Sequence, residues 1–300
     1  MSDYTTKIKC IVILSDKSSG SSALYRFLSL FPEVNHIKYT RHYENETLYW
    51  TKAASILELD QTKMLDSEVP INKHQSKYEL KKFLKRNLKS FSFPKDDKEL
   101  VFSGWRSLCE EYAPVFIEKS PHHLHQWSCL ELMMEFMQRY PNIDVLFIGL
   151  VRNPMDTLYS HWKRWRTYPE KNQIQWFNAY KNLIALKNLL KEKVLILRYE
   201  DFISEVEHLS KVIDFIDSSY TPPNDYFYKT SIQKWKSDKH FGFKLHKDVQ
   251  DFAMQFGYSI DDLINEPSTT WKTYRTVERY QYMTLQRPKK AIKAIVKKLI

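Results

Sequence analysis

The sequence has few glycines and cysteines and no long apolar run. Only 5 of its 300 residues are glycine, well below the usual share of about 7%, which favours long helices over many tight turns. Its three cysteines, Cys10, Cys109 and Cys129, show no paired spacing and indicate core thiols in a reducing compartment. No stretch of about 18 apolar residues is present, and residues 1–9 carry both acidic and basic side chains. We therefore expect no transmembrane helix, no signal peptide and a cytoplasmic location.

Positive charge is abundant and clustered. The formal net charge is +10, which suggests an anionic ligand or partner. Residues 71–95 hold eight Lys or Arg against one acid, and residues 287–300 hold six basic residues and no acid. Such runs are usually solvated helix faces, but the C-terminal one also has isoleucines and a leucine opposite its lysines, so contact with an anionic membrane is an alternative. No nucleic-acid-binding module is recognisable, and we expect no nucleic-acid partner.

Short apolar runs alternate with amphipathic segments along the chain. Strands are predicted over 11–14, 34–37, 115–119, 145–151 and 194–199, and helices over 51–59, 77–88 and 174–190, after Pro154, and around the apolar stripe 124–137. This order predicts an α/β fold with a central parallel sheet flanked by helices. No composition shift divides the chain, so we expect a single domain over 1–300, with a basic helical insertion at about 60–100 and a helical C-terminal region at about 205–300.

A polar turn, Ser15–Ser22, joins the first strand to an amphipathic segment. Hydroxyl groups, Lys17 and the start of a helix would together hold an anionic group, and Gly20 would let the backbone approach it closely. The Gly-x4-Gly-Lys-Ser/Thr pattern of nucleotide triphosphatases is absent. An ordinary strand–turn–helix with a serine N-cap is the structural alternative.

Charged residues also follow the later strands. Lys119, Arg152 and the pair Glu200–Asp201 each stand at or just past a predicted strand end. Ligands of parallel sheets bind at the carboxyl ends of the strands, so we expect a shared anion site there. For Glu200–Asp201 we favour a helix N-terminal role instead.

Two of these segments resemble motifs of the 3′-phosphoadenylyl sulfate (PAPS)-dependent sulfotransferases, closest in style to the carbohydrate and heparan-type enzymes. The 17–22 segment, Lys-Ser-Ser-Gly-Ser-Ser, is similar to the 5′-phosphosulfate loop, and 151–156, Val-Arg-Asn-Pro-Met-Asp, followed by Ser160, is similar to the 3′-phosphate motif. Residues 195–202 resemble a further family segment. The resemblance implies a three-layer P-loop-type fold and PAPS as donor, with no metal. It assigns the donor site to Lys17, Ser18, Ser19, Gly20, Ser21, Ser22, Arg152 and Ser160.

The resemblance also implies catalytic residues. Glu46, followed by Tyr49 and Trp50, has the spacing of the family's glutamate base, and Lys119 lies in a Glu-Lys-Ser-Pro segment similar to one that faces donor and acceptor. Alternatives for the base are Glu44 and a histidine, namely His36, His42, His122, His123 or His125. For the two glutamates, solvated helix N-terminal acids remain the structural alternative.

The loop lysine departs from the family pattern by one residue. Ser18 stands where the family has its Lys or Arg, and Lys17 comes one position earlier. The main catalytic cation is therefore either Lys17 or Lys119. A late basic segment, residues 234–247, is the candidate for a loop covering the cofactor.

The predicted reaction is sulfuryl transfer to a hydroxyl or amine, with a carbohydrate as the favoured acceptor because of the basic 71–95 segment and the glutamate base. Aromatic residues could stack on sugars or line an apolar pocket: Tyr43, Tyr49, Trp50, Trp162 and Trp165. A phosphotransferase and a catalytically impaired protein that binds polyanions are the competing interpretations.

Overall fold

The computed structural model describes residues 7–266 and 268–289 and divides into two compact units. The first unit holds the chain up to Arg152 together with Asn178–Lys229, and the second holds Asn153–Phe177 and the chain from Thr230 onward. Most of the basic C-terminal segment 287–300, with its possible membrane contact, lies outside the described residues. No helix in the described ranges is long and apolar enough to cross a membrane.

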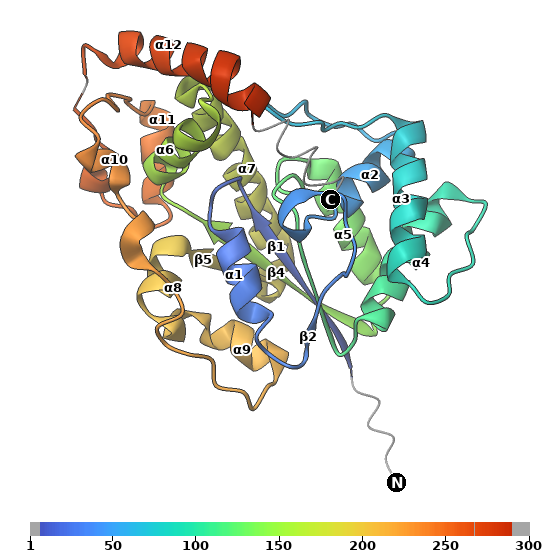
Figure 1. Ribbon diagram of the computed structural model, residues 1–300. Coiled ribbons are helices and arrows are strands. Elements are labelled where there is room, and N and C mark those ends of the chain that lie inside the picture. Colours follow the sequence, from blue (N-terminus) through green and yellow to red (C-terminus); the bar gives the residue numbers. More distant parts are fainter. Residues whose placement is uncertain (1–6, 267, 290–300) are drawn as a thin grey trace. The chain divides into compact units, whose positions relative to one another are not determined.

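A five-stranded parallel sheet is the centre of the first unit (Figure 1). Its strand order is β2-β3-β1-β4-β5, and its strands are β1 (Ile8–Ser15), β2 (Val34–Asn35), β3 (Val115–Lys119), β4 (Ile143–Val151) and β5 (Val194–Arg198). All five strands were predicted, and the parallel α/β fold is confirmed. Consecutive residues from Ile11 to Leu14 are all buried, because helices cover both faces of the sheet.

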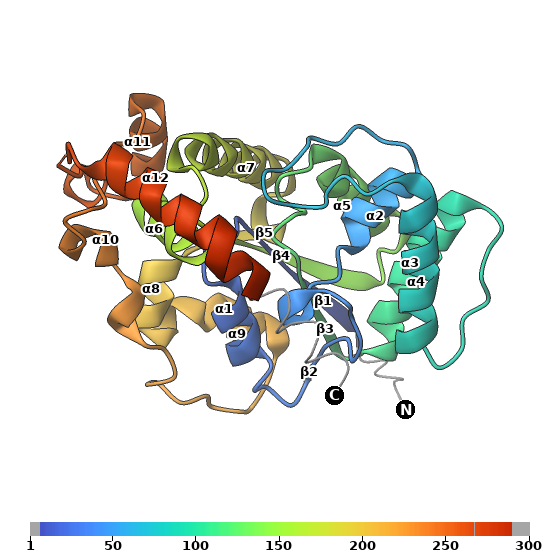
Figure 2. The ribbon, with the colours of Figure 1, turned by 45° about the horizontal axis from the view of Figure 1, so that its top comes forward.

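Helices α1, α8 and α9 lie on one side of the strands, and α5 and the second half of α7 lie on the other (Figure 2). Helix α7 packs closely on the sheet. A β-carbon on Gly149 of β4 would overlap the side chain of Leu183 of α7. The helices with residues in the first unit are α1 (Ser21–Leu28), α2 (Tyr49–Ile56), α3 (Lys73–Asn87), α4 (Asp97–Glu111), α5 (Trp127–Arg139), α7 (Pro169–Leu190), α8 (Tyr199–Ser204) and α9 (Ser210–Ile216).

The second unit is helical. Besides the start of α7, it contains α6 (Pro154–Trp165), α10 (Lys234–Ser237), α11 (Lys247–Met254) and α12 (Trp271–Gln281). Its aromatic core includes Trp162, which lies edge-on to Trp271, and Trp176, which packs on Phe252. Trp162 is therefore a core residue and not a sugar platform.

Local signals explain where several helices begin. Pro154 occupies the first turn of α6, as predicted, and the Asn153 side chain accepts hydrogen bonds from the N–H groups of Met155 and Asp156. Helix α3 starts one turn earlier than predicted, because Asn72 caps it by accepting from the N–H of Gln75.

Helix α4 was not among the predicted helices. The Asp96 side chain accepts from the N–H of Glu99 and starts a helix at Asp97. Its buried residues recur at helical spacing, and they include Leu100, Trp105 and Leu108. The sequence therefore did contain the cap and the periodicity.

Candidate active site

The loop after β1 is shaped by two left-handed residues. Ser18 has φ +60° and Gly20 has φ +90°, and Gly20 is the N-cap of α1. The structural alternative of a serine N-cap is thus wrong. A β-carbon on Gly20 would overlap the ring of Tyr199, so this position needs glycine both for its φ and for its close packing.

Several groups beneath the loop hold it in place. The Asp16 carboxylate accepts from the backbone N–H of Lys17 at 2.7 Å and lies 2.9 Å from Nε2 of His125. The Tyr180 hydroxyl donates to the Leu150 carbonyl at 2.9 Å and lies 3.1 Å from Oγ of Ser19. Neither His125 nor Tyr180 was predicted to support the loop, because each lies far from it in the sequence: His125 in the turn before α5 and Tyr180 in α7.

Arg152 follows β4 and reaches the same loop. Its guanidinium donates to the Ser18 carbonyl at 2.8 Å and lies 4.6 Å from the centre of the Tyr199 ring. Because β4 pairs directly with β1, the carboxyl ends of the two strands bring residues 134 positions apart into contact. The predicted proximity of Arg152 to the loop is present in the structure.

The loop has features that fit a bound phosphate. The Ser18 hydroxyl oxygen is buried and has no hydrogen-bond partner within the described ranges, and buried polar groups without partners are uncommon. The first N–H groups of α1, from Ser21 and Ser22, have no intrahelical acceptors and carry the positive end of the helix dipole. An anion would supply the missing acceptors.

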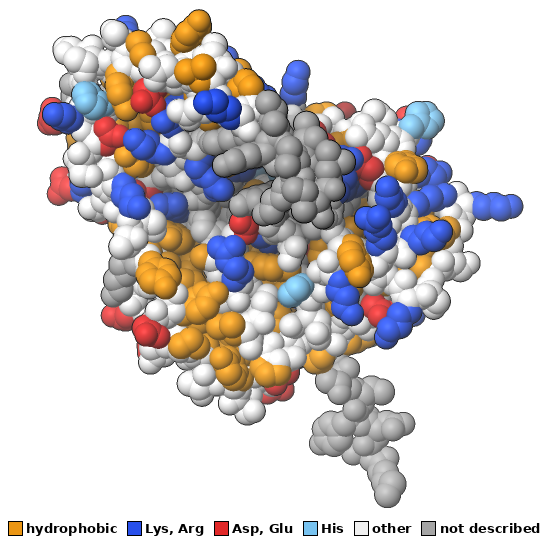
Figure 3. Space-filling model, viewed as in Figure 1, with side chains coloured by type: hydrophobic (Ala, Val, Ile, Leu, Met, Phe, Trp, Pro, Cys, Tyr) orange, Lys and Arg blue, Asp and Glu red, His pale blue; other side chains and the backbone are white. Residues whose placement is uncertain are grey.

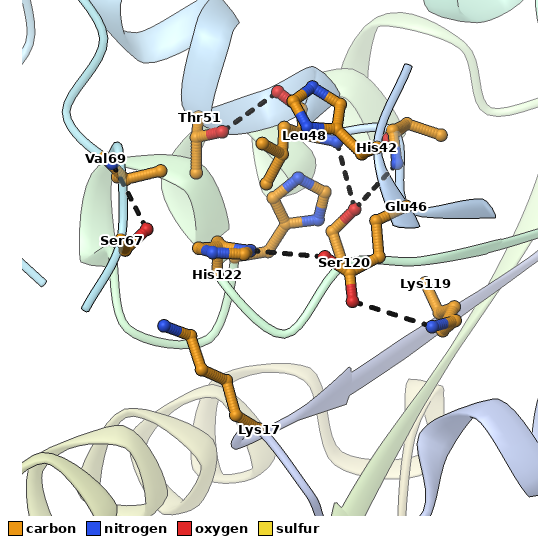
Figure 4. Close-up of polar contacts among 12 residues, drawn as sticks. Lys17, His42, Glu46, Leu48, Thr51, Ser67, Val69, Lys119, Ser120 and His122 are labelled. Atoms are coloured by element: carbon orange, nitrogen blue, oxygen red, sulfur yellow. Dashed lines mark hydrogen bonds and ion pairs between the residues drawn. The ribbon is translucent and has the colours of Figure 1, made fainter. Parts of the chain in front are cut away.

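Glu46 and Lys119 lie face to face (Figure 4). The Glu46 carboxylate is 3.6 Å from Nζ of Lys119 and 3.7 Å from Nδ1 of His122. Lys119 also donates to Oγ of Ser22, at 2.9 Å, so it links Glu46 to the loop. The sequence predicted Glu46 and Lys119 separately, and the structure brings them together.

Burial sets the charge behaviour of this pair. Burial raises the pKa of Glu46, and the charge of Lys119 opposes that effect. For Lys119, burial lowers the pKa, and Glu46 opposes it. Burial and nearby positive charges, Lys17 foremost, lower the pKa of His122 well below its usual value, so this ring is neutral. The carboxylate thus lies between a cation and a neutral imidazole.

Lys17 lies near Glu46 and His122 and also contacts the backbone of residues 65–66. Its Nζ donates to the carbonyls of Leu65 and Asp66, each at 3.2 Å, and burial lowers its pKa. Figure 4 shows the Lys17 side chain extending toward the region of His122. Lys119 donates to the loop hydroxyl of Ser22, and which of the two lysines is the main catalytic cation stays a prediction.

The alternative bases are engaged differently. Glu44 forms an ion pair with Arg26 at 2.8 Å, and the ring of His36 packs beside Tyr25. Burial and the charges of Lys52 and Arg41 lower the pKa of His42 to about 3, too low for an effective base at neutral pH.

His123 is completely buried and accepts from the backbone N–H of Trp50 at 3.2 Å. His125 pairs with Asp16, as described above. Glu46 stays the predicted base. Its carboxylate lies beside Lys119 and His122 and is not a fully solvated acid at a helix N-terminus.

Other sequence predictions have mixed outcomes. Glu200 and Asp201 lie in the first turn of α8, as favoured. Tyr49 and Trp50 are about 1% exposed and pack on Trp105, so they belong to the core and cannot stack on a sugar. Ser160 lies half-buried on α6 in the second unit, and its pairing with Arg152 stays a prediction. The same applies to the 234–247 segment as a cofactor-covering loop.

Comparison with known proteins decides the family. A model described as the sulfotransferase family matches residues 10–222, more than two-thirds of the sequence. The chain belongs to the sulfotransferase family. It is a sulfotransferase enzyme, and the family match favours this interpretation over a phosphotransferase.

Solved structures support the fold assignment. The sulfotransferase domain from the curacin biosynthetic pathway is 18% identical with a TM-score of 0.55, over 83% of this chain and 97% of that one. The sulfotransferase domain from the Synechococcus PCC 7002 olefin synthase is 18% identical with a TM-score of 0.56, over 86% and 98%. No curated protein is significantly similar to the chain in sequence.

No group of three or more His, Cys, Asp or Glu side chains within the described ranges could hold a metal ion. Cys10, Cys109 and Cys129 are buried free thiols.

Proposed function

We propose that this sulfotransferase, acting as one domain over residues 1–300, moves the sulfuryl group of PAPS to a hydroxyl or amine of a carbohydrate by in-line transfer. The observation that carries the proposal is the group formed by Glu46, Lys119 and Ser22. A candidate base lies 3.6 Å from a cation that donates to the anion-binding loop. Base, cation and loop are the three parts that such a transfer requires.

Each residue has a role in this proposal. PAPS, when bound, supplies an activated sulfuryl group. The N–H groups and hydroxyls of Ser18–Ser22 hold its 5′-phosphate, and Arg152, with Ser160, holds its 3′-phosphate. Glu46 takes the proton of the acceptor, and Lys119, assisted by Lys17, neutralises charge that develops on the leaving oxygen.

Isothermal titration with adenosine 3′,5′-bisphosphate, with ATP as the comparison, tests the donor assignment. We expect the bisphosphate to bind and ATP to bind far more weakly, because ATP lacks the 3′-phosphate that Arg152 would hold. If neither nucleotide binds, the donor site is absent, and the alternative of a catalytically impaired protein that binds polyanions gains support from the displaced Lys17.

The surface of α3 supports an anionic carbohydrate as the acceptor. Lys82, Lys85 and Arg86 are exposed on this helix, and Figure 3 shows Lys and Arg side chains gathered over it. Helix α3 is joined to the segment before Glu46, because Glu79 of α3 pairs with Arg41 at 2.7 Å. An extended anionic chain could contact these cations while one of its groups reaches Glu46.

The double variant Lys82→Ala with Lys85→Ala tests this surface. We expect the KM for a uronic-acid-containing oligosaccharide to rise several-fold at low salt and much less at high salt, since exposed charges are screened. The KM for a neutral alcohol acceptor should not change. The matched control removes two other exposed lysines, Lys191 and Lys211. Equal effects of both double variants would refute a specific acceptor surface on α3.

A further inference from the structure

The segment that carries Glu46 has an unfavourable backbone. Glu44, Asn45 and Leu48 all have positive φ, at +55°, +59° and +52°. None of them is glycine, and each such residue costs of order 1 kcal/mol or more unless the surroundings hold it in place. Strain of this kind within three residues of a candidate base calls for a structural cause.

Thr47 is where the segment is held. Its side-chain hydroxyl donates to Oε1 of Glu118 at 2.7 Å, and its backbone N–H donates to Oγ of Ser120 at 3.1 Å. Its carbonyl accepts from Nζ of Lys52 at 3.1 Å. Every polar group of Thr47 is thus hydrogen-bonded, and Thr47 is only 2% exposed.

Glu118 organises these contacts from β3. The Ser120 hydroxyl donates to Oε1 of Glu118 at 2.6 Å. Because its proton is used in this bond, the Ser120 oxygen accepts from the backbone N–H groups of Thr47 and Leu48. Figure 4 shows Ser120 beside Leu48. His123 accepts from the N–H of Trp50, so its own proton is on Nδ1, 3.5 Å from the second oxygen of Glu118.

Glu118 remains ionised in this environment. Burial alone would raise its pKa, but the interactions with His123, Ser120 and Thr47 outweigh burial and lower it. An ionised carboxylate accepts strong hydrogen bonds from both hydroxyls. The Glu118 side chain is completely buried.

Residues 118–120 contact residues 46–48 with alternate side chains. Side chains of neighbouring strand residues point to opposite sides, so Glu118 and Ser120 contact Thr47 while Lys119, between them, contacts Glu46. The position of Thr47 therefore determines where the Glu46 carboxylate lies relative to Lys119.

We propose that Thr47, Glu118 and Ser120 are positioning residues, which hold the strained 44–48 segment so that Glu46 faces Lys119. This inference rests on the proposed role of Glu46 as the base. None of the three positioning side chains needs to touch the donor or the acceptor. Their contribution is to prevent the carboxylate from moving away from the acceptor proton.

Thr47→Val tests the proposal, because valine has the shape of threonine without its hydroxyl. We expect kcat to fall by up to about 100-fold, the loss that a misplacement of about 1 Å can cause. Turnover is measured as release of the 3′,5′-bisphosphate from radiolabelled PAPS. The KM for PAPS and the affinity for the bisphosphate should stay at wild-type values. Thr47→Ser keeps the hydroxyl and should restore most of kcat.

A second measurement needs neither donor nor acceptor. NMR titration of carboxyl-labelled glutamates, with Glu46→Gln to assign the signal, gives the pKa of Glu46. We expect the pKa of Glu46 in Thr47→Val and in Ser120→Ala to differ from the wild-type pKa, and the pKa in Thr47→Ser to equal it. Ser120→Ala serves as the test if Thr47→Val does not fold.

Two outcomes are distinguishable. If the folded variants lose thermal stability but keep kcat and the pKa of Glu46, the three residues are merely structural and the inference is overturned. If Glu46→Gln itself keeps full turnover, the proposed base is wrong, while the titration still reports whether Thr47 positions the Glu46 carboxylate.

Discussion

Replacement of Arg152 by alanine is expected to weaken binding of adenosine 3′,5′-bisphosphate at least about 30-fold, since removing one partner of a buried charge contact costs about 2–5 kcal/mol. Arg152 is 7% exposed, donates to the Ser18 carbonyl and stacks on Tyr199. Its loss would remove a cation and also loosen the loop. Isothermal titration measures the affinity, and circular dichroism checks that the fold is intact.

Two further variants sharpen this test. Arg152→Lys keeps the charge but not the planar fork, so its affinity should lie between those of the wild type and Arg152→Ala. Arg139→Ala is a matched control. Arg139 also stacks on an aromatic ring, 4.3 Å from the centre of Phe102, but it belongs to α5 and not to the proposed donor site. Unchanged bisphosphate affinity in Arg152→Ala would rule out Arg152 as a donor-binding residue.

Glu46→Gln is expected to keep bisphosphate binding and to lower kcat by about 10²–10⁴-fold, the usual contribution of a general base. Glutamine preserves the size of the side chain but cannot take a proton. Glu44→Gln is the matched control, since Glu44 pairs with Arg26 instead, and it should keep nearly full turnover. Full activity of Glu46→Gln would transfer the base role to Glu44 or to a histidine.

The wild-type pH profile gives an independent check of Glu46. A base must be ionised to act, so kcat should fall as the pH falls through the pKa of Glu46. Burial raises this pKa above the ordinary value of 4.5, and the acid limb of the profile should therefore lie above pH 4.5. A limb at or below that value would mean that another group titrates.

The two segments proposed to bind the donor could be recognised in the sequence because their signals are local. The Arg-Asn-Pro segment contains a strand end, a helix cap and a first-turn proline in consecutive positions, and α6 begins there in the structure. The turn after β1 was readable for the same reason. Helix α4 shows that local signals can also be overlooked, because the cap at Asp96 follows a segment with a proline and two phenylalanines.

Aromatic residues were harder to interpret, because their chemistry suits both a binding surface and a core. Tyr49 and Trp50 follow Glu46 closely and were considered as sugar platforms. The helix that begins at Tyr49 turns both rings into the core, where they meet Trp105. Only the packing of α2 against its neighbours decides between these roles.

The sequence alone determined the order of the strands, the polar loop after β1 and the candidate residues Glu46, Lys119 and Arg152. These depend on spacing and residue type within a few positions. The tertiary structure decided which of them meet: Lys119 with Glu46 and Ser22, Arg152 with Ser18 and Tyr199, and Glu118 with Thr47. The physical reason is that parallel strands bring their carboxyl ends to one edge of the sheet. Contacts there join residues from 47 positions apart (Arg152 and Tyr199) to 134 positions apart (Ser18 and Arg152), and no local pattern encodes such pairing.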